Sequence, residues 1–314
     1  RGFRFNSRNF KDNKTIFKIN ENKNTSLILG GSFSFGVGST SDENTISGYL
    51  SSNGDNFLNL SGSAHIGFQE IVSIFSNINL IKKVDKIIFI SGINDLYLSN
   101  FFGISYPDTF YFNSEYIANM NQTKIGFKKK IFKFFLDKVS PGILKGNNIN
   151  KLKKENFLNF LFSKKFRTSH TIHEELTLSM EQKLERNFII YDMLKKYFNC
   201  KVYFYLQPGL LWSKEKSEEE EKLFEYSNIF FKEKTEFINK LFTAGNYEYL
   251  KNIFTKLSIK YDISFVDLNE YFKKNLKKND WIFLDSIHIN DNGNKLISEI
   301  IKSQWIFFFI SALY

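Results

Sequence analysis

The stretch Ser26-Leu-Ile-Leu-Gly30-Gly-Ser32-Phe-Ser-Phe-Gly36 decides the fold of this chain. A short apolar run, Ser26–Leu29, enters a glycine-rich turn that carries a serine. Comparable runs of four to six residues recur at Phe57–Leu60, Lys86–Ile90, Lys201–Leu206 and Ile263–Val266. Continuous apolar runs of this length are typical of strands that are buried on both faces of a parallel sheet.

Amphipathic stretches separate these runs. One predicted helix is marked by the apolar positions Phe68, Ile71, Val72, Phe75 and Ile78, and another by Leu184, Phe188, Tyr191, Leu194 and Phe198. Strand followed by helix, repeated along the chain, predicts a doubly wound α/β sheet. No internal repeat or Gly/Ser linker divides the chain, so residues 1–314 are predicted to form one domain. The segment 97–178 is too long for an ordinary connection, and we interpret it as an insertion over one edge of the sheet.

The composition is that of a globular protein. The chain has 314 residues, of which 42% are hydrophobic and only three are prolines, which excludes disordered and collagen-like classes. The single cysteine, Cys200, cannot form an intramolecular disulfide. No apolar stretch reaches the roughly 20 residues that span a bilayer. We expect a cytoplasmic protein or one peripheral to a membrane, with any N-terminal signal or anchor absent from a chain that begins at Arg1.

The net charge of +10 belongs to one segment. Residues 123–167 hold 13 Lys/Arg and 2 Asp/Glu, so the rest of the chain is close to neutral. These lysines alternate with aromatic residues, a pattern that suits contact with an anionic surface or a membrane interface. The favoured interpretation is a helix that docks Phe127, Ile131 and Phe135 on the protein and leaves its lysines in water. A nucleic-acid partner is disfavoured, because no zinc-finger spacing or RNA-binding motif is present. The acidic run Glu218–Glu221 is expected to be a solvated helix start.

Two short motifs carry residues suited to catalysis. Ser32 stands at the carboxyl end of the first predicted strand, where open α/β sheets bind ligands and backbone N–H groups can hold an oxyanion. Asp285 and His288 are three residues apart near the other end of the chain, so the carboxylate can lie beside one imidazole nitrogen while the other accepts a proton. Taken singly, each motif could be structural, as a Gly-Gly-Ser turn or a helix cap.

The order of the motifs is more specific. Gly62 follows the second predicted strand and Asn94 follows the third, and the carboxyl ends of parallel strands meet at one edge of the sheet. Four blocks in this order resemble the SGNH (GDSL-type) hydrolase superfamily, named for its Ser, Gly, Asn and His. The resemblance covers nearly the whole chain outside the insertion. It implies a three-layer α/β/α fold with a five-stranded, flavodoxin-like parallel sheet and a large helical insertion after strand three. Gly31 replaces the Asp of the usual Gly-Asp-Ser block.

The resemblance also implies roles for five residues. Ser32 would be the nucleophile, His288 the general base and then general acid, and Asp285 the residue that orients His288. The oxyanion hole would consist of the backbone N–H groups of Ser32 and Gly62 and the side-chain amide of Asn94. Gly67 is the nearest rival of Gly62. Phe33, His65 and Gln207 are candidates for the substrate pocket.

The implied activity is that of a serine esterase acting through an acyl-enzyme intermediate, without a cofactor. The pair His170 and His173 matches no standard zinc spacing, and the mechanism needs no metal. The opening Gly2–Ser7 resembles bacterial members associated with surface polysaccharides, so an acetyl ester on a carbohydrate is the first expected substrate. An O-acyltransferase that acylates a glycan at the same site, a lipase or thioesterase, and a non-catalytic binding module that uses the basic segment are the alternatives. The sequence does not predict the oligomeric state.

Overall fold

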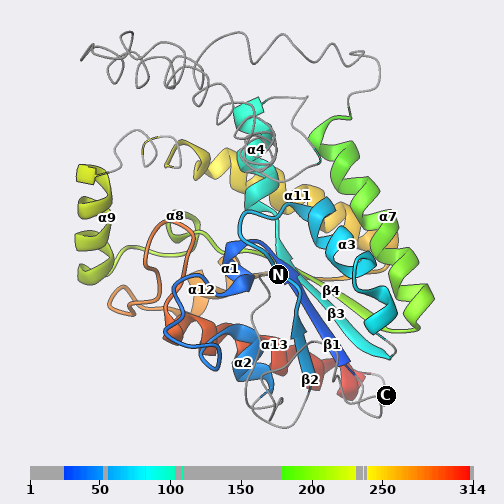
Figure 1. The fold of residues 1–314 in the computed structure, drawn as a ribbon. Coiled ribbons are helices and arrows are strands. Elements are labelled where there is room, and N and C mark those ends of the chain that lie inside the picture. The colour runs from blue at the N-terminus through cyan, green and yellow to red at the C-terminus, as the bar shows by residue number, and fades with distance from the viewer. Residues whose placement is uncertain are drawn as a thin grey trace, which may run out of the picture. The chain divides into compact units, whose positions relative to one another are not determined.

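A five-stranded sheet forms the centre of the protein. The computed structural model describes residues 25–51, 56–81, 83–102, 108, 178–230, 236 and 239–311. The strands are β1 (Thr25–Gly30), β2 (Asn56–Asn59), β3 (Val84–Ser91), β4 (Lys201–Leu206) and β5 (Ser264–Asp267). They are ordered β2-β1-β3-β4-β5 and every neighbouring pair is parallel (Figure 1). This order is the flavodoxin-like, doubly wound one, so the predicted fold class is confirmed.

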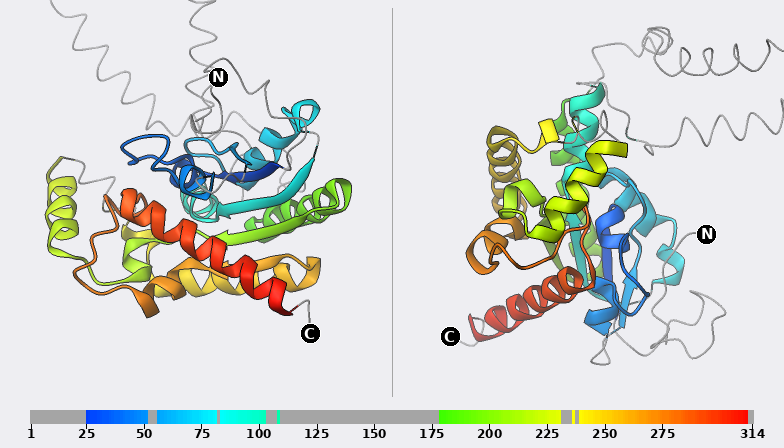
Figure 2. Two further views of the ribbon diagram at one scale, coloured as in Figure 1. Left: turned by 90° about the horizontal axis from the view of Figure 1, so that it is seen from below. Right: turned by 90° about the vertical axis from the view of Figure 1, so that its left-hand side faces the viewer.

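Helices cover both faces of the sheet (Figures 1 and 2). The helical elements are α1 (Ser32–Phe35), α2 (Ile46–Ser51), α3 (Gly67–Phe75), a 3-10 turn (Ile78–Leu80), α4 (Ile93–Phe102), α7 (Met180–Phe198), α8 (Leu210–Ser213), α9 (Glu218–Phe230), α11 (Ala244–Tyr261), α12 (Leu268–Asn275) and α13 (Asp291–Ser311). One apolar core lies between the sheet and α3, α7 and α11. A second core lies on the opposite face, against α1, α2, α12 and α13.

The strands supply both cores, because successive side chains of a strand point to opposite faces. Leu27 and Leu29 of β1 belong to the first core, and Ile28 between them belongs to the second. All six residues of β1 are buried. The continuous apolar run in the sequence therefore reflects burial on both faces of the sheet.

Of the two helices predicted from apolar spacing, one buries the expected residues and the other does so only in part. In α7, Leu184, Phe188, Tyr191 and Leu194 are buried as predicted. In α3, Ile71 and Ile74 form the buried stripe, while Val72 and Phe75 are exposed. The prediction for α3 was therefore wrong at Val72 and Phe75. The face that contacts the sheet runs through Ile71 and Ile74, which are three residues apart.

Most of the predicted insertion lies outside the described residues. The chain divides into two units, one of Arg1–Tyr111 with Leu178–Tyr314 and the other of Phe112–Thr177. Helix α4 continues from the sheet edge as far as Phe102, so residues 97–102 are an extension of this helix. The basic segment 123–167, the His170–His173 pair and the opening Gly2–Ser7 fall outside the described residues, and the expectations about them stay predictions. Within the described ranges, no helix is long and apolar enough to cross a membrane.

Candidate active site

Ser32 lies where β1 passes into α1. Gly31 before it has an extended backbone, and Ser32 is the first residue of the helical turn. The first N–H groups of a helix have no partner within the helix, so the N–H of Ser32 is available at this edge of the sheet. The turn is fixed from behind, since the buried hydroxyl of Ser34 donates to the carbonyl of Ile90 in β3 at 3.1 Å. Ser32 itself is partly exposed.

Asp285 and His288 are carried by a short hairpin, residues 282–290, which we call the His288 hairpin. Phe283 and Ile289 pair as an antiparallel bridge and both are buried. The N–H of Leu284 donates to the carbonyl of His288 at 2.8 Å, which closes the turn. The apolar pair therefore anchors the hairpin in the core, while its polar tip reaches the edge of the sheet.

The structure brings Ser32, His288 and Asp285 together. Nε2 of His288 lies 2.8 Å from Oγ of Ser32, and Nδ1 of His288 lies 2.6 Å from Oδ2 of Asp285. A carboxylate only accepts hydrogen bonds, so Nδ1 carries the ring proton and Nε2 is left to accept the proton of the serine hydroxyl. This is the geometry that makes a neutral serine hydroxyl a usable nucleophile.

Asp285 is held as a carboxylate by its own loop. Its Oδ1 accepts the backbone N–H groups of Ile287 at 2.8 Å and His288 at 2.7 Å. Burial alone would raise the pKa of Asp285, but the hydrogen bond from His288 and the two backbone donors outweigh burial and lower the pKa below its usual value. Asp285 is therefore ionised at neutral pH and favours the His288 tautomer described above.

Asn94 stands at the carboxyl end of β3, near the start of α4. Its Nδ2 donates one hydrogen to the carbonyl of His65 at 2.7 Å, and an amide nitrogen has a second hydrogen to offer. The amide also lies against Gly31, because a Cβ at position 31 would collide with Asn94 Nδ2. Asn94 is thus next to the residue that precedes Ser32, where an oxyanion donor is needed. The same contact explains the glycine at position 31.

The backbone N–H of Gly62 is not free, as an oxyanion donor would require. Its N–H donates to the carbonyl of Gly30 at 3.2 Å and so extends the β1–β2 ladder by one more bond. The expected role of this N–H as an oxyanion donor is therefore not supported. The absence of a side chain has another consequence, because a Cβ at Gly62 would occupy the space of the His65 ring. Gly67, the rival, begins α3 and donates its N–H to Asp95 at 3.1 Å.

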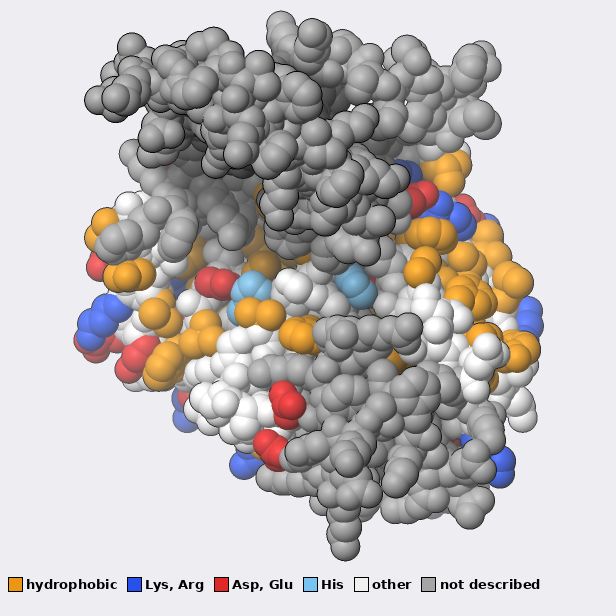
Figure 3. Space-filling view, viewed as in Figure 1, with side chains coloured by type: hydrophobic (Ala, Val, Ile, Leu, Met, Phe, Trp, Pro, Cys, Tyr) orange, Lys and Arg blue, Asp and Glu red, His pale blue; other side chains and the backbone are white. Residues whose placement is uncertain are grey.

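Two of the three residues expected in the substrate pocket are buried. Phe33 is 1% exposed and belongs to the core against α2 and α13, because its side chain points away from Ser32 into the sheet–helix layer. Gln207 is buried as well, and its amide lies 3.5 Å from the carbonyl of Ile287 in the His288 hairpin. His65 is partly exposed, like His288, and histidine side chains reach the surface in the view of Figure 3. Burial lowers the pKa of His65.

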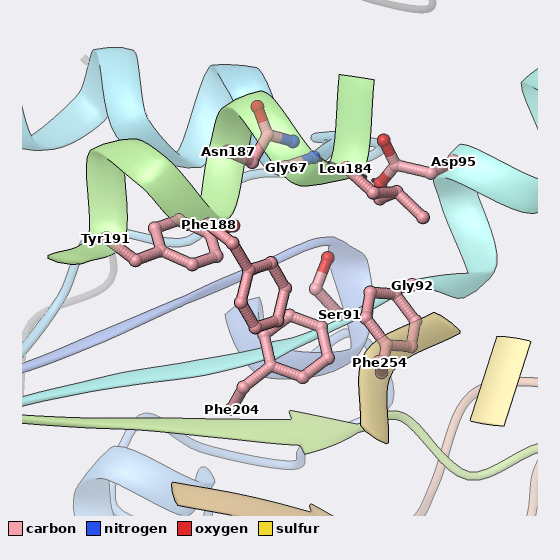
Figure 4. A pocket seen from close by; sticks show the side chains of 10 residues that line it. All are labelled: Gly67, Ser91, Gly92, Asp95, Leu184, Asn187, Phe188, Tyr191, Phe204 and Phe254. Atoms are coloured by element: carbon pink, nitrogen blue, oxygen red, sulfur yellow. Dashed lines mark hydrogen bonds between the residues drawn. The ribbon is translucent and has the colours of Figure 1, made fainter. Parts of the chain in front are cut away.

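Asp95, the residue after Asn94, is a buried acidic group that was not predicted from the sequence. Asp95 is 2% exposed, and burial raises its pKa to about 6, although the N–H of Gly67 binds its carboxylate. Asp95 and Ser91 line a small pocket between β3, α3 and α7 (Figure 4). The hydroxyl of Ser91 donates to the fully buried Glu70 at 2.5 Å. Asn94 and Asp95 thus both hold the segment 65–67, one through the His65 carbonyl and the other through the Gly67 N–H.

The expectation for the acidic run Glu218–Glu221 was wrong at one position. Glu220 is 2% exposed, and its carboxylate contacts the His288 hairpin. The signal that could have found it is the spacing of Ser217 and Glu220, since Ser-x-x-Glu is the pattern of a capping box. In the described part of the chain, no group of three or more His, Cys, Asp or Glu is arranged to hold a metal ion.

Comparisons with known proteins give structural matches only. No protein-family model matches the chain, and no curated protein is significantly similar to it in sequence. An acetyl xylan esterase, AlAXEase, is similar with 12% identity and a TM-score of 0.45, over 89% of this chain and 98% of that one. An extracellular lipase from Streptomyces rimosus is similar with 13% identity and a TM-score of 0.43, over 89% and 99%. A two-domain esterase active on acetylated mannans is similar with 9% identity and a TM-score of 0.43, over 90% of this chain and 48% of that one.

Proposed function

We propose that this protein is a serine esterase in which Ser32 is the nucleophile, His288 the general base and Asp285 the residue that orients the base. The observation that carries the proposal is the pair of contacts made by His288, 2.8 Å to Ser32 Oγ and 2.6 Å to Asp285 Oδ2. A protein that only binds a ligand does not need a hydroxyl, an imidazole and a carboxylate hydrogen-bonded one to the next. An enzyme that activates a serine needs all three.

The reaction would proceed in two halves. Ser32 Oγ attacks the ester carbonyl carbon while its proton passes to His288 Nε2, and the carbonyl oxygen becomes an oxyanion. The N–H of Ser32 and the free hydrogen of the Asn94 amide are the donors available to stabilise this charge. His288 then gives its proton to the departing alcohol, which leaves an acyl group on Ser32. Water, deprotonated by His288, attacks the acyl group, and the carboxylic acid leaves as Ser32 regains its proton.

The substrate we propose to test first is an acetyl ester on a carbohydrate, as the sequence resemblance implies. Purified protein is expected to release acetate from p-nitrophenyl acetate and from acetylated polysaccharides. Ser32→Ala should abolish the release. Ser76→Ala is the matched control, because it removes a serine hydroxyl at an exposed position, the C-terminal end of α3. Equal acetate release by Ser32→Ala and the unmodified protein would exclude the proposed mechanism.

The same assay separates hydrolysis from transfer. Adding a glycan acceptor should leave acetate as the main product if water is the natural acceptor. Accumulation of acetylated glycan at the expense of acetate would identify an O-acyltransferase with the same nucleophile.

A further inference from the structure

Glu220 is a buried carboxylate with an unusually complete set of donors. It is the third residue of α9, and its side chain has no exposed surface. Its Oε1 accepts the backbone N–H groups of Ile282 at 3.0 Å and Phe283 at 2.9 Å. Its Oε2 accepts the backbone N–H of Ser217 at 2.8 Å and the ammonium of Lys214 at 2.5 Å. Both oxygens are therefore fully used.

The ion pair with Lys214 is buried on both sides. The Lys214 side chain is 3% exposed, so water screens the pair very little. Burying two charges is costly unless the geometry is good and further hydrogen bonds satisfy the remaining lone pairs. Three backbone donors and one ammonium meet that requirement at Glu220. The neighbouring Glu218, by contrast, keeps its carboxylate exposed to water, where it pairs with Lys222.

The two backbone donors on Oε1 belong to the His288 hairpin. Ile282 and Phe283 lie on its first strand, and Asp285 follows two residues later. The inner edge of this strand pairs with the second strand, since Asn290 donates to the Ile282 carbonyl at 2.8 Å. Glu220 therefore binds two N–H groups of this strand that do not bond to the second strand.

The tip of the hairpin is held by the same part of the chain that carries Glu220. The N–H of Leu210, at the start of α8, donates to the carbonyl of Ser286 at 3.0 Å. The segment from Leu210 to Glu220 thus contacts the hairpin at two points, one near its base and one between Asp285 and His288. These contacts fix the hairpin as a body, without contacting the side chain of His288.

We propose that Glu220 is a positioning residue that holds the His288 hairpin so that His288 Nε2 stays within hydrogen-bond distance of Ser32 Oγ. Lys214 keeps the carboxylate in place between the two segments. The inference rests on the proposed function, because it assumes that the contact between His288 and Ser32 is the productive one. Asp285 and His288 lie on the same hairpin, so their mutual contact is independent of Glu220.

The length of the side chain is part of the proposal. Glu220 reaches Ile282 and Phe283 with one oxygen and Lys214 and Ser217 with the other. Glu220→Gln keeps one acceptor oxygen, but its NH₂ group would face two hydrogen-bond donors and could not accept from them. Glu220→Asp keeps the charge but is shorter by one methylene and cannot span both sets of donors. Both variants should displace the hairpin relative to Ser32.

The test uses the rate at which Ser32 reacts with a small fluorophosphonate, which needs no knowledge of the natural substrate. Ser32 Oγ forms a bond to phosphorus, fluoride leaves, and the hydroxyl proton passes to His288. The second-order rate constant, measured on the full chain and corrected for the folded fraction, is expected to fall about 10- to 100-fold in Glu220→Gln, because sub-ångström placement governs such reactions. Glu218→Gln is the matched control. It makes the same change two residues away at an exposed surface pair and should react like the unmodified protein.

The pH profile of labelling distinguishes positioning from other roles. The midpoint should stay unchanged in Glu220→Gln, since the contact between Asp285 and His288 is kept, while the plateau rate falls. A normal rate per folded molecule together with a lowered Tm would reduce Glu220 to a stabilising residue and overturn the proposal. A shifted midpoint with an unchanged plateau would overturn it as well.

Two further measurements keep the test decisive. If Glu220→Gln does not fold, Glu220→Asp takes its place, and a wild-type labelling rate in that variant would contradict the proposal. Ser32→Ala and His288→Ala test the proposed function in the same assay. If the unmodified protein is not labelled at Ser32, the proposed function fails. If it is labelled and both Glu220 variants match it, only the positioning role fails.

Discussion

His288 Nε2 lies 2.8 Å from Ser32 Oγ although 256 positions separate the two residues in the chain. The parallel sheet accounts for this proximity. Ser32 follows the end of β1, which lies between β2 and β3, and the His288 hairpin returns the chain to the same edge of the sheet after β5 and α12. Every strand ends at that edge, so residues from distant parts of the sequence can form one site.

Asp285→Asn should lower kcat by about 10³–10⁴, as expected when the orienting carboxylate is replaced by an amide that favours the wrong histidine tautomer. Steady-state hydrolysis of p-nitrophenyl acetate measures this. The thermal midpoint of the variant at neutral pH shows whether the fold is kept. A loss of less than tenfold in a folded variant would contradict the role of Asp285.

The stability contributed by Asp285 should depend on pH in a defined direction. The folded-state pKa of Asp285 lies below its unfolded value, so the folded protein favours the ionised form. This contribution is fully present above the unfolded pKa of about 4 and is lost as the pH falls through the lower folded pKa. Urea unfolding of the unmodified protein and Asp285→Asn should therefore differ most at neutral pH and converge in acid.

Asp95→Asn should show the opposite pH dependence. Burial raises the pKa of Asp95 to about 6, so ionisation of this carboxyl opposes folding above that pH. The amide keeps an acceptor for the Gly67 N–H without a charge. The variant is expected to be more stable than the unmodified protein above pH 6, and the difference should vanish as the pH falls towards the unfolded pKa of about 4. A variant that is less stable at pH 7 would contradict this account.

Asn94→Ala should reduce kcat by about 10²–10³ with little change in KM, because an oxyanion donor acts mainly in the transition state. The substitution also removes the hydrogen bond to the His65 carbonyl. Fluorophosphonate labelling and ester hydrolysis should both slow. Unchanged kcat would exclude Asn94 from the oxyanion site.

Gly31→Ala should lower activity without removing any chemical group. The new Cβ would collide with Asn94 Nδ2, so the amide must move away from Ser32. We expect at least a tenfold loss of kcat, since a displaced donor loses most of its effect. Gly245→Ala is the control, because the same methyl at the start of α11 meets only the Thr243 hydroxyl, at an ordinary van der Waals distance of 4.0 Å, and should leave activity unchanged. Full activity of Gly31→Ala would show that Asn94 is not held against this glycine.

The sequence was enough to predict those site residues that lie beyond the carboxyl ends of strands. Ser32 and Asn94 come directly after apolar runs whose burial on both faces identifies a parallel sheet, while Asp285 and His288 follow the last run only after helix α12. Once the sheet is parallel, the position of these residues at one edge follows from its geometry. The bounds of β4 agreed with the predicted ones for the same reason.

Other features depended on contacts that no local pattern encodes. Glu220 belongs to a run of four glutamates, and only the approach of Ile282 and Phe283 from about 60 positions away distinguishes it from its solvated neighbours. Gly62 is near the site as predicted, but whether its N–H is free depends on how far the β1–β2 ladder extends. Phe33 is adjacent to Ser32 in sequence, and the helical turn directs it into the core. Tertiary contacts decided each of these outcomes.

Trapping the acyl-enzyme tests the central claim most directly. The protein is mixed with p-nitrophenyl acetate, quenched in acid within one turnover, digested and analysed by peptide mass spectrometry. Activation of Ser32 by His288 predicts one acetyl group on the peptide that contains Ser32, and a trapped fraction that falls sharply in His288→Ala. Acetylation at another residue, or release of acetate by Ser32→Ala at the unmodified rate, would contradict it.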